Sequence, residues 1–168
     1  MEYRIPSNRL SPKKRRESNP IGITELVKII KHIKRPDVFM AVFMSWAFGL
    51  RREEVINLKC ADISIENKQV KVVQGKYSKD RYIPIIDDRY IEIIQNWLKK
   101  NKDEYFVTSY ENKSKRLSKT VLYKYYSNAL KEVKLDVVEY HAKGGKPRYK
   151  HNFHSLNNLF SFQHAYTD

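Results

Sequence analysis

Residues 47–58 read AFGLRREEVINL and place an arginine directly after a glycine break, at the start of a short amphipathic helix. The glycine is a typical helix terminator after the apolar run that precedes it. Val55, Ile56 and Leu58 then supply the apolar contacts of the new helix. A guanidinium held at such a helix start can bind two oxygens of a phosphate at once. The alternative is that Arg51 only pairs with Glu54 and its neighbours on a solvated face.

Two further segments extend this pattern. Residues 72–85, VVQGKYSKDRYIPI, predict two apolar strands joined by a short turn that holds a lysine beside a glycine. Residues 153–157, FHSLN, place a histidine at the start of another helix. A lysine in a turn can reach a phosphate without disturbing the strands on either side of it.

The three segments, in this order, resemble the catalytic domain of the tyrosine recombinases, also called phage-type integrases. The motifs of that family run GLRxxE, then a GKxxK hairpin, then HxLR, and the resemblance covers residues 21–160. It implies DNA integration or site-specific recombination, in which a tyrosine attacks a phosphodiester and leaves a 3′-phosphotyrosyl link. The free 5′ hydroxyl of a partner strand then resolves that link.

The resemblance also assigns roles to residues. Arg51 is the first catalytic arginine and Glu54 its structural partner, Lys76 is the general acid that protonates the leaving 5′ oxygen, and His154 donates to the phosphate or shuttles a proton. For His154, a capping or core-edge histidine is the open alternative. Further phosphate contacts are expected from basic residues in or near the same segments, namely Arg52, Lys79, Arg81, Lys146, Arg148 and Lys150.

The chain departs from the family pattern at two places. Asn157 occupies the position of the second arginine and brings no charge. The nucleophilic tyrosine is expected several helical turns further on, but the sequence stops at Asp168, and Tyr166 follows Asn157 too closely to serve. We therefore expect a C-terminally truncated catalytic domain that binds duplex DNA and cleaves it weakly or not at all alone.

Composition favours a polyanionic partner. The 168 residues contain 33 Lys+Arg against 19 Asp+Glu, which gives a net charge of +14 and a pI near 9.7. The single cysteine, Cys60, excludes an internal disulfide, and the apolar stretch 38–50 is too short to span a bilayer. We expect a cytoplasmic, nucleoid-associated protein with no membrane partner.

No metal site, cofactor or small-molecule substrate is expected. The five histidines lack neighbouring carboxylates, and Gly144-Gly145 before Lys146 is not a phosphate-cradling loop. The reaction of the resembled family needs neither metal nor nucleotide. The partners expected are double-stranded DNA and other recombinase subunits, which assemble as tetramers in that family.

Residues 1–20 are basic and rich in proline, serine and asparagine, which predicts an extended arm that can follow phosphates. A disordered tail or a cut linker is the alternative. Residues 21–168 then form one catalytic domain. Apolar periodicity predicts helices from residue 24, over 38–48 and 51–59, over 89–100 and around 122–133, and a last one from His154. Three strands are predicted at 63–65, 69–73 and 81–85, and a loop at 136–150.

The sequence thus predicts a mainly helical α+β fold with a small three-stranded antiparallel sheet. The function that it favours is that of a DNA-binding recombinase or integrase domain. The alternative is a non-catalytic basic nucleic-acid-binding module or regulator.

Overall fold

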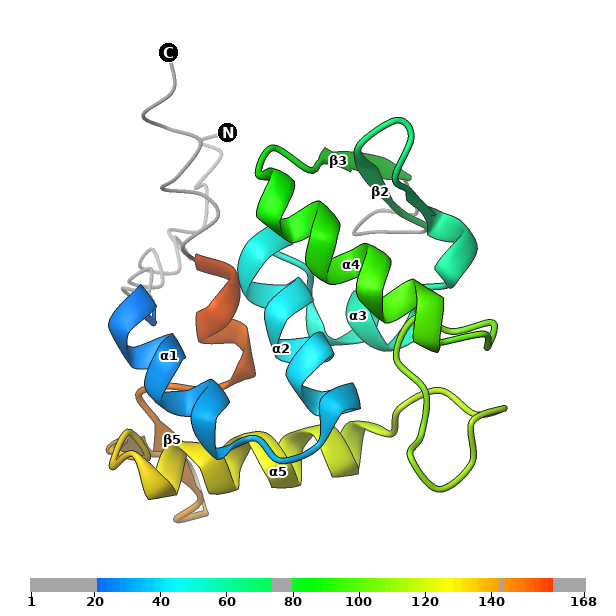
Figure 1. Ribbon diagram of the computed structural model, residues 1–168. Coiled ribbons are helices and arrows are strands. Elements are labelled where there is room, and N and C mark those ends of the chain that lie inside the picture. The colour runs from blue at the N-terminus through cyan, green and yellow to red at the C-terminus, as the bar shows by residue number, and fades with distance from the viewer. Residues whose placement is uncertain (1–20, 74–79, 143, 159–168) are drawn as a thin grey trace, which may run out of the picture.

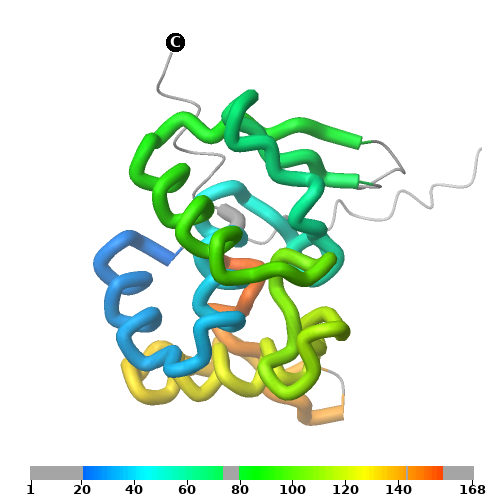
Figure 2. Tube along the Cα trace, turned by 45° about the vertical axis from the view of Figure 1, so that its right-hand side comes forward, coloured from blue at the N-terminus to red at the C-terminus, as the bar shows by residue number. Residues whose placement is uncertain are grey.

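The computed structural model describes residues 21–73, 80–142 and 144–158. Within these residues the helices pack around α2, a three-stranded sheet lies at one end of the molecule, and α5 lies at the opposite end (Figures 1 and 2). The mainly helical α+β fold expected from the sequence is confirmed. Among the described helices none is long and apolar enough to cross a membrane.

The first two helices build the centre of the core. α1 (Ile23–His32) buries Leu26 and Ile29, and its start is capped by Glu25, whose carboxylate accepts the Gly22 N–H at 2.9 Å. α2 (Pro36–Phe48) carries Pro36 in its first turn and is buried along nearly its whole length. Each large side chain buried in this way contributes roughly 1.5–3 kcal/mol to folding.

Three further helices surround α2. α3 (Arg52–Asn57) is shorter than expected, whereas α4 (Asp88–Lys100) and α5 (Lys119–Glu132) match the periodicity closely. The side chains of Asp87 and Ser118 cap α4 and α5 by accepting backbone N–H groups. These caps fix where α4 and α5 begin.

The sheet runs in the order β1 (Ile63–Ser64), β2 (Gln69–Val72), β3 (Arg81–Pro84), with antiparallel pairs throughout. A 3₁₀ turn, η1 (Cys60–Asp62), leads into it from α3. Val70, Val72 and Ile83 point into the core, since side chains alternate between the two faces of a strand. The three-stranded antiparallel sheet was predicted correctly.

The predicted loop at 136–150 is wrong. β4 (Val138–His141) and β5 (Pro147–Tyr149) form an antiparallel hairpin, and Gly144 and Gly145 turn it with φ angles of 85° and 73°. The last described element, η2 (Phe153–Asn158), is a 3₁₀ helix that begins one residue before His154. Val138 and Tyr140 alternate with Glu139 and His141 as in a strand, but Gly144, Gly145, Pro147 and the basic residues of this segment are also typical of a loop.

Aromatic contacts hold α4 on α2. The ring of Tyr90 meets those of Phe43, Trp46 and Phe48 edge-on, with centroids 5.4, 6.4 and 6.0 Å apart. Because β3 leads directly into α4, this packing also sets where the sheet lies relative to α2 and α3. Four of the charged residues singled out from the sequence lie at the corner between α3 and β3, namely Arg51, Arg52, Glu54 and Arg81.

Candidate active site

Arg51 sits where the chain turns from α2 into α3. Gly49 has a φ of 61°, in the left-handed region, and ends α2. Leu50 is completely buried, and its carbonyl accepts the hydroxyl of Ser45 at 2.6 Å. The backbone of Arg51 is thus held between a buried anchor and a helix, while its side chain remains 46% exposed.

Glu54 ties the Arg51 side chain to this corner. Its Oε2 accepts the backbone N–H of Arg51 at 2.7 Å, and its Oε1 accepts Arg51 Nη1 at 3.0 Å. The Glu54 side chain is only 8% exposed. The pairing that was the alternative to a phosphate-binding Arg51 is therefore present. Among the described residues this pairing engages one nitrogen of the Arg51 guanidinium, Nη1, which leaves further N–H donors of the fork for a phosphate.

A second arginine, Arg81 in the sheet, pairs with the same carboxylate. Arg81 is the first residue of β3, and its Nη1 and Nη2 donate to Glu54 Oε1 and Oε2, each at 2.8 Å. Burial raises the pKa of the Glu54 carboxyl, but the hydrogen bonds from Arg81 and Arg51 outweigh it and hold that pKa below its usual range. The same bond raises the pKa of the Arg81 guanidinium.

Arg81 was predicted to contact a phosphate, and in the structure its guanidinium also has a protein partner, Glu54. Both ends of its fork are occupied by Glu54, so Arg81 braces the carboxylate that orients Arg51. Lys76 and Lys79 lie outside the described residues. The pairing of β2 with β3 closes at Val72 and Arg81, the strand positions that flank their segment.

A second set of charges surrounds α3. Glu53 pairs with Arg52 at 3.1 Å and with Lys119, the first residue of α5, at 2.7 Å. The Lys119 ammonium is the larger of the two effects that lower the pKa of the Glu53 carboxyl. Positive charge is therefore in excess around α3. Four cations, Arg51, Arg52, Arg81 and Lys119, pair with two carboxylates, Glu53 and Glu54.

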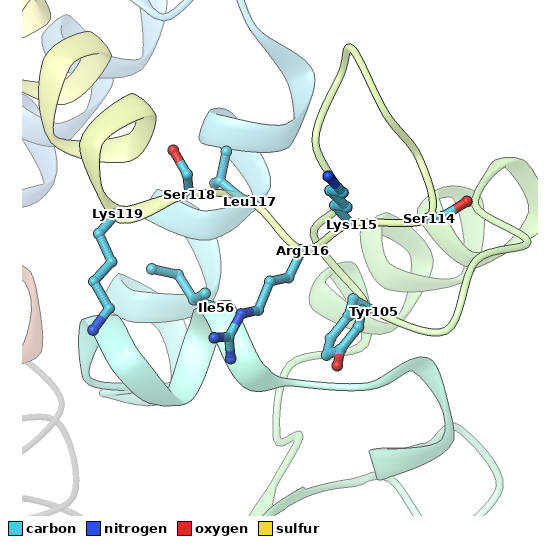
Figure 3. A pocket seen from close by; sticks show the side chains of 8 residues that line it. All are labelled: Ile56, Tyr105, Ser114, Lys115, Arg116, Leu117, Ser118 and Lys119. Atoms are coloured by element: carbon cyan, nitrogen blue, oxygen red, sulfur yellow. The ribbon is translucent and has the colours of Figure 1, made fainter.

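A groove of about 560 Å³ continues this basic surface beside α3 (Figure 3). The side chains of Arg116 and Lys119 extend toward α3, and Arg116 Nη1 donates to Asn57 Oδ1. The groove is lined by Ile56, Tyr105, Ser114, Lys115, Arg116, Leu117, Ser118 and Lys119. Lys115, Arg116 and Lys119 were not among the site residues predicted from the sequence. The basic run KSKRLSK at 113–119, which leads into the capped helix α5, could have indicated them.

His154 is presented on the exposed side of η2, which packs against α2. Its backbone N–H donates to Asn152 Oδ1 at 2.8 Å, and the Asn152 N–H donates to Ser155 Oγ at 3.1 Å. The side chains that cap this turn are therefore those of Asn152 and Ser155. No hydrogen bond or ion pair within the described residues joins His154 to Arg51 or Glu54.

The remaining predicted residues belong to other segments of the chain. Lys146, Arg148 and Lys150 are exposed in and beside the β4–β5 hairpin. Tyr166 lies outside the described residues. Within the described ranges, no cluster of three or more histidine, cysteine, aspartate or glutamate residues could hold a metal ion.

Comparison with known proteins matches residues 22–163 to the phage integrase family. A tyrosine recombinase XerA of Pyrococcus furiosus is 37% identical over 103 residues, which cover 59% of this chain and 35% of that protein. The lambda integrase catalytic core superposes with a TM-score of 0.62 at 20% identity, covering 86% of this chain and 84% of that one. A lambda integrase dimer bound to a COC′ core site gives a TM-score of 0.63 at 21% identity, covering 83% and 39%.

The chain belongs to the phage integrase family, and its fold is that of the tyrosine recombinase catalytic domain. It spans about a third of the length of the Pyrococcus furiosus relative. The expected family and fold are confirmed.

Proposed function

We propose that this chain is the DNA-binding core of a site-specific recombinase, in which Arg51 stabilises the charge that develops on a scissile phosphate. The observation that carries the proposal is the shared carboxylate of Glu54. It is nearly buried, it receives both ends of the Arg81 fork, and it holds one nitrogen of Arg51 while half of that side chain faces solvent. A cation oriented in advance stabilises a developing oxyanion without having to reorganise during the reaction.

The partner in this proposal is duplex DNA. The excess of cations around α3 and the basic groove beside it suit a phosphate backbone, and the protein carries a net charge of +14. The related lambda integrase structure holds a core site, which supports the same class of ligand here. Other recombinase subunits are the second partner, and the site of action is the nucleoid in the cytoplasm.

Lys76 and His154 complete the proposed chemistry. Lys76 protonates the leaving 5′ oxygen, and His154 donates to a non-bridging oxygen of the phosphate. Glu54 and Arg81 position Arg51 without touching the DNA. The proposal assigns no nucleophilic tyrosine in this chain, so the experiment supplies one from a second subunit.

The test measures covalent adduct on a nicked suicide duplex. This chain is mixed with a full-length family member that keeps its tyrosine but carries alanine at its own first catalytic arginine. Adduct above the partner-only control is expected, and Arg51→Ala in this chain should lower its rate about 10²–10³-fold. Duplex affinity should fall less than about tenfold, because a catalytic arginine acts mainly on the chemical step.

The second candidate is a non-catalytic nucleic-acid-binding module. The asparagine at position 157, where the family carries its second arginine, favours it. Adduct that never exceeds the partner-only control, together with salt-dependent duplex binding, would select this candidate and contradict the first.

A further inference from the structure

A cavity of about 120 Å³ lies away from the charged corner, between α5, β5 and the turn that leads into η2. Ring side chains form much of its wall, and those of Tyr126 and Phe153 meet edge-on with centroids 5.4 Å apart. The residues that line it are Tyr123, Tyr126, Ser127, Leu130, Lys131, Asp136, Tyr149, His151, Asn152 and Phe153.

Two buried polar atoms in this wall lack a partner. Tyr126 is 1% exposed and His151 5% exposed, and within the described residues neither the Tyr126 hydroxyl nor His151 Nδ1 makes a hydrogen bond. Only one other side-chain atom in the described ranges is in this condition, Trp46 Nε1 in α2, and Trp46 does not line the cavity. Since unpaired buried polar groups are costly and rare, two of them at one cavity point to a guest that pairs with both.

We infer that this cavity binds a neutral single-ring molecule that carries a hydroxyl or a similar group able both to donate and to accept hydrogen bonds. The volume is close to that of an engineered cavity, about 150 Å³, that takes up benzene, and it is larger than one water molecule needs. The ring walls suit an edge-on or offset aromatic guest.

The polar groups define the rest of the ligand. The guest hydroxyl accepts from the Tyr126 hydroxyl and donates to His151 Nδ1 in the tautomer that leaves this nitrogen unprotonated. The cavity is lined by one cationic side chain, Lys131, and one anionic side chain, Asp136. Their charges balance, so the lining favours neither a cationic nor an anionic ligand. Asn152 and Phe153 directly precede His154, so an occupied cavity borders the turn that carries His154. Binding here does not depend on the proposed DNA chemistry.

The experiment compares two fluorinated probes by ¹⁹F NMR titration of the full chain. 4-Fluorophenol carries the hydroxyl, and fluorobenzene has the same ring without it. We expect saturable binding of both, with 4-fluorophenol at least about tenfold tighter because it alone satisfies the two wall atoms. Tyr126→Phe should weaken 4-fluorophenol about tenfold and leave fluorobenzene unchanged within about twofold.

Matched variants locate the site. Tyr123 lines the same cavity three residues earlier on α5 but is 52% exposed, so Tyr123→Phe should change neither affinity by more than about twofold. Ser127→Leu fills the cavity and should weaken both probes. Equal affinity of the two probes for the unaltered protein would overturn the inference, whatever the variants do. So would the absence of saturable binding, which would mean that the cavity holds water only.

Discussion

The α3–β3 corner and the η2 region present their candidate residues in opposite ways. At the corner, Glu54 pairs with Arg51, three positions before it, and with Arg81, 27 positions after it, and Glu53 joins Arg52 to Lys119. At η2, the hydrogen bond that His154 makes to another described residue comes from its backbone, and His151 and Tyr126 nearby have buried side-chain atoms without a partner in the described part of the chain. One region is therefore oriented by ion pairs between distant elements, and the other by local turn caps beside a cavity.

Substitutions in the two regions should therefore have different effects on folding. Removing a partner from the corner should disturb folding and the orientation of Arg51 together, because the same bonds serve both. Changing His154 should leave folding intact, because its side chain is exposed and no described interaction depends on its ring.

Glu54→Ala should cause the largest loss. It leaves two arginines facing each other without their shared carboxylate, and the expected cost is about 2–3 kcal/mol in free energy of unfolding, reduced from that of a fully buried pair by the solvent exposure of the arginines. Urea unfolding followed by circular dichroism measures it. Glu53→Ala is the matched control, since this carboxylate also has two cationic partners but is 46% exposed, and it should cost less than about 1 kcal/mol. Equal losses would show that the Glu54 arrangement has no special weight.

Arg81→Ala should cost about 1–2 kcal/mol, since Glu54 keeps Arg51 as a partner. It also separates the two roles considered for Arg81. If Arg81 braces Glu54, the salt dependence of duplex binding should stay unchanged, whereas loss of a phosphate contact would lower the slope of log K against log salt by about one. Fluorescence polarisation at several salt concentrations gives the slope, and Arg52→Ala serves as the comparison.

The stability that Glu54 contributes at the corner should also depend on pH. The folded-state pKa of Glu54 lies below the ordinary value of 4.5, so its stabilising contribution is complete above that value and is lost as pH falls through the folded pKa. The melting temperature of the unaltered protein should therefore exceed that of Glu54→Gln near pH 7, and the gap should shrink below about pH 4.5. A gap that widens in acid would have the wrong sign for this account.

His154→Ala should have the smallest effect on stability, within about 0.5 kcal/mol, because surface substitutions away from packed or paired groups rarely exceed that. Asn152→Ala should cost more, about 0.5–1.5 kcal/mol, because its side chain caps the turn. The reverse ranking in thermal unfolding would show that the His154 ring, rather than the Asn152 cap, holds η2 in place.

The helices and contacts that depend on residues close together in the sequence were predicted correctly. The apolar spacing around Ile29 and Ile94 predicts α1 and α4, and the GLRxxE motif predicts the pairing of Arg51 with Glu54 one turn later. The β4–β5 hairpin was missed because its strands are short and largely exposed, and because the glycines, proline and basic residues of this segment are also typical of a loop. The contact of Arg81 with Glu54 was not predicted, because only the folded sheet brings β3 against α3. The position of Arg116 and Lys119 beside α3 was not predicted for the same reason, since α3 lies far from them in sequence.

A crystal structure of the chain with a short DNA duplex would show whether Arg51, braced by Glu54 and Arg81, binds a phosphate. We expect a phosphate oxygen within hydrogen-bond distance of the Arg51 guanidinium, with both Glu54 oxygens still held by Arg81. A duplex bound elsewhere, with Arg51 turned away from every phosphate, would refute this role of Arg51.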